Sequence, residues 1–283
     1  MPEGPADAAR VARGALAGGC FEDVRWVDET GSTNADVLAL ASDGEPEGIV
    51  LVADHQTAGR GRRDRSWQAP PGSSLLVSVL LRPTAAVADV VTMAAALAMA
   101  EAVEATCGVA ARLKWPNDLV VDVDGADRKL AGVLAEADWP ARSPIAAGWS
   151  PPPPGERMVV VVGIGLNVQW PADLPDDLAA TLTALNLVTG GTVDRTELLV
   201  AYLRALAARY LPLVRTRERG EVLAAWKARS ATLGRRVRVD LGADDVVGTA
   251  VDVTTDGHLV IETVDGTRRT VAVGDVVHLR PAN

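Results

Sequence analysis

The sequence predicts an α+β fold, in which a mixed β-sheet flanked by helices occupies residues 1–232 and a small β-barrel occupies residues 233–283. Apolar runs of strand length alternate with longer segments whose apolar residues recur at helical spacing. From Arg235 onward, short alternating runs follow one another, separated by Gly/Asp turns. With 283 residues and 48% hydrophobic content, the chain is long enough for one sizeable core and a small second module.

The first part of the chain predicts alternating strands and helices. After a weakly helical start and a strand at residues 24–27, GSTNADVLALAS predicts a helix that begins at Ser32 or Thr33, where a side-chain oxygen can cap the first amides. The elements expected next are a buried strand at residues 49–53, an arginine-rich loop, a strand at residues 74–81 ended by Pro83, and an Ala-rich helix at about residues 87–106.

The next part predicts paired strands and then helices. RLKWPNDLVV and RKLAGVLAEAD, joined by a Gly/Asp turn at residues 124–127, are expected to form a hairpin, and MVVVVGIGLNV a further strand. Residues 139–157 contain four consecutive prolines, which cannot donate to a β-ladder, so an extended hairpin tip is expected there. From Asp194, a suitable helix cap, to Arg229 the apolar spacing is helical.

The last fifty residues predict the small barrel, with a domain boundary near Thr232. The expected strands are residues 237–239, 246–253, 259–263, 270–273 and 276–279.

Composition limits the classes of function. A formal net charge of -9 argues against sequence-independent duplex binding, which requires a cationic surface. The longest apolar stretch, near residues 93–100, is shorter than the roughly 20 residues of a membrane span, and a secretory leader is not apparent, so a cytoplasmic protein is expected. Cys20 and Cys107 lie far apart, which argues against a disulfide framework or a cysteine metal site.

The segment HQTAGRGRRDRSW concentrates positive charge in this acidic chain. Gly59 and Gly61 allow backbone amides to turn toward a ligand, and arginine forks suit phosphate or carboxylate oxygens. Repulsion among the four arginines predicts a mobile loop that orders over a phosphate-bearing ligand, with Trp67 covering an apolar part of it. A solvated basic loop or a nucleic-acid contact remains open as an alternative, and the P-loop pattern is absent from the sequence.

Three further strings carry candidate site residues. The rigid Trp-Pro step of LKWPND would present Lys114 and Asp118 on either side of a bend, although a salt bridge at a strand end is an alternative. Lysine is rare in this arginine-rich chain, so Lys129 is a candidate for a role that arginine cannot fill. Gly132, and the two glycines of GIGLNV, indicate a β-bulge or a ligand lying close to the sheet.

Taken together, neutral polar groups at Ser32, Thr33 and Gln56, cations at Arg60, Arg62 and Lys129, and the acid Asp118 favour activation of a small carboxylic acid by a nucleotide. The strings STN, GRGRRDRSW, KWPND, RKLAGVLAE and GIGLNV, in this order, resemble the biotin protein ligase family over most of residues 24–280.

The resemblance implies a class II synthetase-like catalytic domain with an SH3-like C-terminal barrel. It also implies the reaction: biotin and ATP, with Mg²⁺, form biotinyl-5′-AMP and pyrophosphate, and a lysine of the biotin carboxyl carrier domain of acetyl-CoA carboxylase then takes the biotin. A protein-bound metal is not implied, because Mg²⁺ would come with ATP.

The resemblance also implies the site residues. Those that would contact biotin are Ser32, Thr33, Asn34, Gln56, Gly59, Arg60, Lys129, Gly132, Gly163 and Gly165. Those that would contact ATP are Arg62, Arg63, Arg65, Trp67, Lys114, Asn117 and Asn167. Catalysis would involve Arg60, Arg62, Lys129, which bridges the biotin carboxylate and the α-phosphate, and Asp118, which orients the carrier lysine.

Two features depart from the family pattern. Asp64 places a carboxylate among the loop arginines, where it would weaken their field. Residues 1–23 are too few for the N-terminal winged helix-turn-helix domain of bifunctional members, so repression and a nucleic-acid partner are not expected. A lipoate-type ligase and a nucleic-acid-binding regulator remain as alternatives, and the oligomeric state and the carriers modified stay open.

Overall fold

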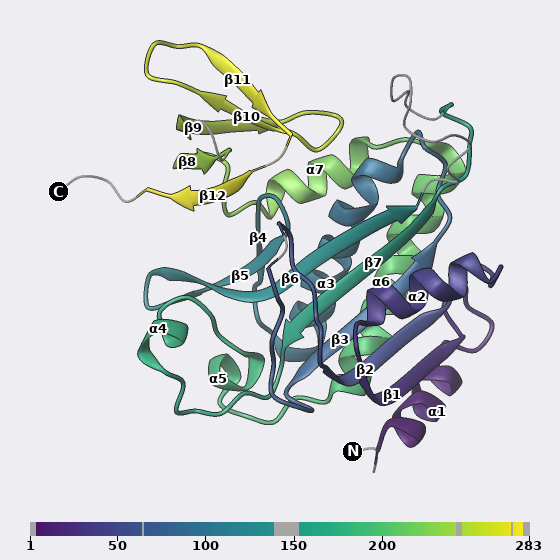
Figure 1. The fold of residues 1–283 in the computed structure, drawn as a ribbon. Helices are drawn as coiled ribbons and strands as arrows, with labels where there is room; N and C mark the ends of the chain where they lie inside the picture. The colour runs from purple at the N-terminus through teal and green to yellow at the C-terminus, as the bar shows by residue number, and fades with distance from the viewer. Residues whose placement is uncertain (1–3, 64, 139–152, 242–244, 273, 280–283) are drawn as a thin grey trace.

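A computed structural model describes residues 4–63, 65–138, 153–241, 245–272 and 274–279. Seven strands form one sheet in the order β1-β2-β3-β7-β6-β5-β4, in which β1 and β2 are parallel and the other neighbours are antiparallel (Figure 1). Their bounds are β1 (Val24–Thr30), β2 (Val50–Gln56), β3 (Ser74–Leu81), β4 (Arg112–Lys114), β5 (Asp118–Val123), β6 (Ala126–Asp138) and β7 (Val159–Asn167). The predicted mixed sheet is therefore confirmed.

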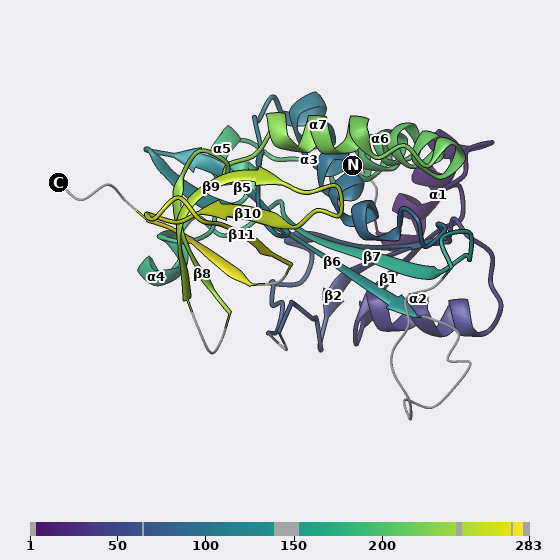
Figure 2. The ribbon, with the colours of Figure 1, turned by 90° about the horizontal axis from the view of Figure 1, so that it is seen from above.

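Helices cover both faces of this sheet. They are α1 (Pro5–Leu16), α2 (Thr33–Ser42), the 3-10 turn η1 (Ala88–Val90), α3 (Val91–Cys107), α4 (Asp176–Ala179), α5 (Leu185–Thr189), α6 (Arg195–Thr216) and α7 (Gly220–Ala228). Figure 2 shows α1, α3 and α6 on one face of the sheet and α2 on the other. The larger core lies under α3 and α6, and a smaller one lies under α2.

The alternation of side chains along the central strands determines where the sheet stays open. Val161 and Leu80 pack under α2. The residues that follow on the same face of these strands are small: Gly163 and Gly165 on β7, and Ser78 on β3. The α2 face is therefore filled with side chains at one end and is bare beyond it.

The C-terminal module is a five-stranded antiparallel sheet in the order β11-β10-β9-β8-β12. Its strands are β8 (Arg236–Asp240), β9 (Asp245–Val253), β10 (Leu259–Glu262), β11 (Arg268–Val271) and β12 (Asp275–His278). It is attached to the larger domain through α7, where the Lys227 ammonium lies 2.6 Å from Asp252, and through the Trp115 indole, which donates to the Gly257 carbonyl at 2.9 Å. The predicted β module is confirmed.

The ends of two helices, α6 and α2, test the predicted helix caps. Asp194 caps α6 by accepting from the amides of Thr196 and Glu197, as predicted. The expected cap by a hydroxyl of the Ser32/Thr33 pair is wrong, because Ser32 occupies the N-cap position of α2 without a capping side-chain bond. The short helices α4 and α5 were not predicted, because so few residues give no periodic signal.

The apolar stretch in the long Ala-rich helix is longer than expected from the sequence. Residues Ala88–Cys107 are long and apolar enough, by length and composition, to cross a membrane, although 67% of the apolar window is buried inside the protein. α3 packs between the sheet and α6, as the core helix of a globular protein does. Cys20 and Cys107 are both free cysteines. Most of the predicted proline-rich tip, residues 139–152, and Asp64 lie outside the described residues.

Candidate functional site

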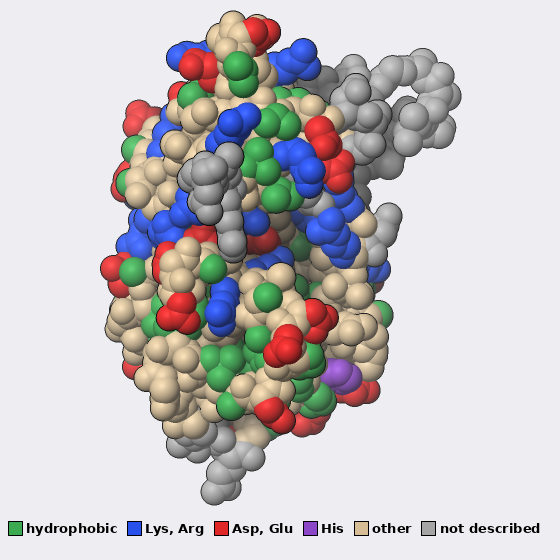
Figure 3. All heavy atoms as spheres, turned by 90° about the vertical axis from the view of Figure 1, so that its left-hand side faces the viewer, with side chains coloured by type: hydrophobic (Ala, Val, Ile, Leu, Met, Phe, Trp, Pro, Cys, Tyr) green, Lys and Arg blue, Asp and Glu red, His purple; other side chains and the backbone are tan. Residues whose placement is uncertain are grey.

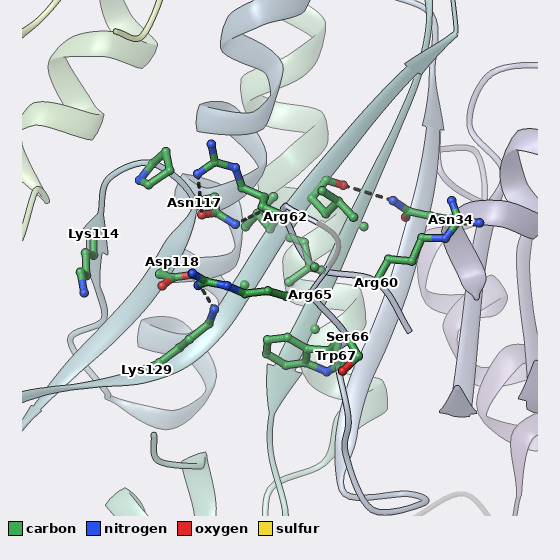
Figure 4. A pocket seen from close by; sticks show the side chains of 18 of the residues that line it. Asn34, Arg60, Arg62, Arg65, Ser66, Trp67, Lys114, Asn117, Asp118 and Lys129 are labelled. Atoms are coloured by element: carbon green, nitrogen blue, oxygen red, sulfur yellow. Dashed lines mark hydrogen bonds and ion pairs between the residues drawn. The ribbon is translucent and has the colours of Figure 1, made fainter. Parts of the chain in front are cut away.

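A cavity of about 340 Å³ opens on the bare part of the sheet. Its lining comes from the start of α2, the arginine loop, the β4–β5 turn, strands β6 and β7, and β12 of the C-terminal module (Figure 4). This volume falls within the range of small-molecule sites, which are commonly a few hundred Å³. Apolar strand residues and charged side chains therefore converge on a space suited to a small ligand.

Glycines form the floor of this cavity. A Cβ atom on Gly165 would lie 2.5 Å from the Trp67 ring, and one on Gly163 would lie 2.2 Å from the Asn34 side-chain oxygen. A Cβ atom on Gly132 would lie 3.1 Å from Trp67. The Trp67 indole thus lies against the floor, and its buried Nε1 meets no hydrogen-bond partner among the residues that the structure describes. A close approach at the glycines, which the sequence predicted as one of two explanations, is present.

The alternative explanation, a β-bulge at the glycines, is wrong, because Gly132 and Gly165 pair with each other in regular register. A bulge does occur nearby, between β5 and β6. The β5–β6 register shifts between Leu119 and Val120. Lys129 stands beside this bulge, and its backbone bonds instead to Thr181 and Thr183. The bulge lets the strand turn Lys129 toward the cavity without losing its backbone hydrogen bonds.

One end of the cavity carries neutral polar groups held in a network. The Gln56 Oε1 atom accepts from the Thr33 amide at 2.7 Å and from the Thr33 hydroxyl at 2.9 Å. Gln56 therefore does what was expected of a hydroxyl and bonds the first amide of α2. The Ser78 hydroxyl donates to Thr33 Oγ1 at 2.7 Å and lies 2.6 Å from Asn34 Oδ1. This end is suited to an uncharged ligand group with its own donors and acceptors.

At the centre, the Lys129 ammonium lies 2.7 Å from the Asp118 carboxylate and 5.4 Å from the centroid of the Trp67 ring. Lys114 pairs with Asp118 in the backbone register of β4 and β5, but the ion pair of Asp118 is with Lys129. In Figure 4, Arg65 also extends toward Asp118. The site therefore concentrates cations around one carboxylate, next to the glycine floor.

The arginine loop has a definite backbone. The Trp67 amide donates to the Gly59 carbonyl at 2.9 Å, and the Gly61 amide donates to the Arg65 carbonyl at 2.6 Å. These bonds, with an isolated bridge between Arg60 and Ser66, form a narrow hairpin over the cavity. The structure thus gives the loop more internal bonding than the sequence suggested. Its ordering by a ligand stays a prediction.

The arginine side chains spread to different partners. Arg60 lies 3.2 Å from the Glu136 carboxylate, which also accepts from Asn34 at 2.7 Å. Arg62 donates at 3.4 Å to the Asn117 side-chain oxygen and at 3.4 Å to the Gly274 carbonyl. The loop therefore connects the polar end of the cavity to the C-terminal module. Figure 3 shows Lys and Arg side chains in a belt across the middle of the outer face, between the two domains.

The cavity brings most of the predicted site residues together. Those that line it are Ser32, Thr33, Asn34, Gln56, Arg60, Arg62, Arg65, Trp67, Lys114, Asn117, Asp118, Lys129, Gly132, Gly163 and Gly165. Three predicted residues are not in the lining: Gly59, Arg63 and Asn167. Asn167 is buried and donates to the Thr183 carbonyl at 3.0 Å, and Arg63 donates to the Asp240 carbonyl at 3.3 Å.

Sequence reasoning missed several participants, four of which are informative. Val276 and Val277 of β12 line the cavity, and only the docking of the two domains places them there. Ser78 and Glu136 support the polar end. A signal for these two was present: Ser78 interrupts an apolar strand, and Glu136 has the strand parity of Gly132.

Two family models and several known proteins are similar to this chain. Residues 27–139 match the model of the biotin/lipoate A/B protein ligase family, and residues 232–279 match that of the biotin protein ligase C-terminal domain. The chain is 38% identical to the biotin--[acetyl-CoA-carboxylase] ligase of Mycobacterium tuberculosis, over 93% of this chain and 92% of the relative. It is 30% identical to the bifunctional ligase/repressor BirA of Bacillus subtilis, over 86% of this chain and 70% of the relative.

Among solved structures, the fold is similar to the biotin protein ligase of Aquifex aeolicus in complex with biotin and ATP. The TM-score is 0.69 and the identity 25%, and the match covers 92% of this chain and 100% of the other.

Proposed function

The chain belongs to the biotin protein ligase family, and on that premise we propose that it activates biotin with ATP and transfers it to a lysine of a carrier protein. The observation that carries this proposal is the Lys129–Asp118 pair, placed between a neutral polar end and an arginine-rich end above a glycine floor. The carrier would be the biotin carboxyl carrier domain of acetyl-CoA carboxylase, as the name of the mycobacterial relative indicates.

Biotin would lie on the glycine floor with its ureido ring at the polar end. The neutral donors and acceptors of Ser32, Thr33 and Gln56 suit an uncharged amide-like ring better than charged groups would. The floor admits a fused bicyclic ligand because Gly132 and Gly165 have no side chain. Trp67 covers these glycines, so its indole must shift when the ring binds.

Lys129 would direct the first chemical step. In that step a biotin carboxylate oxygen attacks the α-phosphorus of ATP, a new P–O bond forms, and the bond to pyrophosphate breaks. Negative charge develops on the α-phosphate, and a compact ammonium next to it lowers the barrier. The biotin carboxylate and the α-phosphate would draw Lys129 away from Asp118. This ion pair is partly exposed, with 36% of the Lys129 side chain and 23% of the Asp118 side chain accessible to solvent.

Asp118 would then serve the second step. An amine of the carrier lysine attacks the acyl carbon of biotinyl-5′-AMP, an amide bond forms, and AMP leaves as a phosphate monoester. The attacking nitrogen must lose a proton, and a carboxylate within reach of it can orient the amine and accept that proton. Asp118 lines the cavity at the side of Lys129, which suits this role.

The nucleotide would occupy the end that is rich in cations. Arg62 and Asn117 bond each other there, Lys114 also lines this end, and Arg65 extends in from the loop. Phosphoryl transfer depends mainly on positioning and electrostatic stabilisation, for which arginine forks are well suited. Mg²⁺ would arrive with the triphosphate, because this ion is usually held by substrate phosphates with few protein ligands.

The remaining sequence predictions fit this proposal with changed roles. Arg63, outside the cavity, would hold the loop to the C-terminal module through the Asp240 carbonyl. Asn167 would fix the end of β7 through its bond to Thr183. Gly59 would admit the close approach of the Trp67 carbonyl, since a Cβ there would lie 2.5 Å from that oxygen. We further propose a division of the chain at residues 1–232 and 233–283, and a cytoplasmic location, where ATP is available.

The test is direct. The purified chain, incubated with biotin, ATP and Mg²⁺, is expected to form biotinyl-5′-AMP and pyrophosphate, detected by mass spectrometry, and to label an added carrier domain on its lysine. Lipoate in place of biotin tests the alternative ligase, and chelation of Mg²⁺ tests the metal. Absence of the biotinyl adenylate, or an equal yield with lipoate, would contradict the proposal.

A further inference from the structure

A nearly buried carboxylate lies outside the cavity, where the two domains meet. Asp127, at the start of β6, has a side chain that is 10% exposed. Arg112 of β4 binds its Oδ1 atom, the Arg235 guanidinium lies 2.6 Å from Oδ2, and the His278 Nδ1 atom lies 3.3 Å from Oδ2. One carboxylate thus receives a cation from the larger domain, and a cation and an imidazole from the C-terminal side of the chain.

The imidazole of His278 is itself held on its other side. Its Nε2 atom lies 3.3 Å from the hydroxyl oxygen of Thr232, which also accepts from the Trp115 amide at 3.0 Å. Thr232 is fully buried. The end of β12 is therefore fixed between the β4–β5 turn, through Thr232, and the β5–β6 turn, through Asp127.

The same two elements form part of the cavity. Lys129 follows Asp127 by two residues on β6 and points into the cavity. Val276 and Val277, directly before His278 on β12, line the cavity, and the Gly274 carbonyl accepts from Arg62. Asp127 therefore connects the strand that carries the central lysine to the strand that closes the Arg62 and Asn117 end.

The contact between the two domains depends on the negative charge of Asp127. Arg112, Arg235 and Lys114 place positive charge around His278. Among the described residues, Asp127 is the carboxylate shared by Arg112 and Arg235. Without its charge the two guanidinium groups would face each other across the domain junction and repel.

We propose that Asp127 is a positioning residue that fixes β12 against the catalytic sheet and thereby shapes the nucleotide end of the cavity. The inference rests on the proposed function for the identity of that nucleotide, ATP. It predicts a selective defect, because Gly274, directly before β12, accepts from Arg62, which in turn bonds Asn117. The polar end is held instead by bonds among α2, β2 and β3.

The test compares Asp127→Asn with Asp122→Asn. Asp122 lies on the same hairpin, 3.7 Å from the same Arg112, but its contacts with Arg112 and with the Gly125 amide stay within the larger domain. Asp127→Asn is expected to raise the KM for ATP at least fivefold in pyrophosphate release, with kcat within twofold and the Kd of biotin unchanged. Amide hydrogen exchange of residues 275–278 should become faster. The Asp122→Asn variant should match the unmodified protein in all four measurements.

Two results would overturn the proposal. One is an Asp127→Asn variant with unchanged KM for ATP and unchanged exchange at β12. The other is a loss of kcat alone, which indicates a smaller folded fraction and no role in positioning. If Asp127→Asn does not fold, Arg235→Gln removes the partner on the module side while keeping the Arg112 pair, and the same KM shift is expected. If the unmodified chain forms no adenylate, the proposed function fails, and the exchange comparison alone decides the positioning role.

Discussion

His278 should make the stability of the protein depend on pH in a defined window. Burial, together with the nearby charges of Lys114 and Arg235, lowers the pKa of His278 from 6.5 to about 4, although Asp127 acts in the opposite direction. Arg112, bound to the same carboxylate, adds to the positive surroundings. The folded protein therefore holds this imidazole neutral at pH values where the unfolded chain already protonates it.

The direction and size of the effect follow from this difference in pKa. Because the pKa in the folded state is lower than in the unfolded state, the stabilisation is present above about pH 6.5 and is lost as the pH falls toward 4. At about 1.36 kcal/mol per pKa unit, the total loss is about 3 kcal/mol, and about 2 kcal/mol of it occurs between pH 7 and pH 5.

The assay is urea unfolding of the protein and of His278→Asn at pH 7, 6 and 5, followed by tryptophan fluorescence. Trp115, one of seven tryptophans, contacts both domains, so part of the change in emission reports on their separation. The variant is less stable at pH 7 because it loses the contact with Thr232, but its stability should fall by about 2 kcal/mol less than that of the unmodified protein between pH 7 and pH 5. Parallel pH profiles, or an NMR titration of His278 with a midpoint near 6.5, would refute the reasoning.

Four further predictions concern the cavity. Lys129→Ala should lower the rate of adenylate formation by at least about 100-fold while leaving the unfolding midpoint within the experimental error, and near-normal pyrophosphate release would contradict its role. Arg62→Gly should release biotinyl-5′-AMP and label lysines of an added bystander protein, whereas an unchanged labelling pattern on blots would argue against retention by the loop. Gly165→Ala should weaken biotin binding at least tenfold by calorimetry, with Gly191→Ala, which has open space around it, as the unaffected control. Trypsin should cut the loop in the ligand-free protein and spare it with biotin and ATP, and equal cleavage in both states would mean that the loop does not close.

The sequence by itself determined most of the elements and pointed to most of the predicted residues that line the cavity. Apolar alternation and helical spacing depend on neighbours within a few residues, so the strands, the long helices and the small β module could be predicted locally. Gly132 and Gly165 could be singled out because glycine is disfavoured inside strands. Lys129 could be singled out because lysine is rare in this arginine-rich chain.

Only the tertiary structure decided which of these groups meet. That Asp118 pairs with Lys129 and not with Lys114 depends on the register and bulge of two strands. That Gln56 bonds the start of α2 depends on the packing of the helix beside β2. The C-terminal strand that closes the cavity reaches it through contacts made across more than a hundred residues of chain, such as the one between Asp127 and His278. Sequence patterns record local preference, whereas these contacts arise from the docking of whole elements, which no short stretch of the chain specifies.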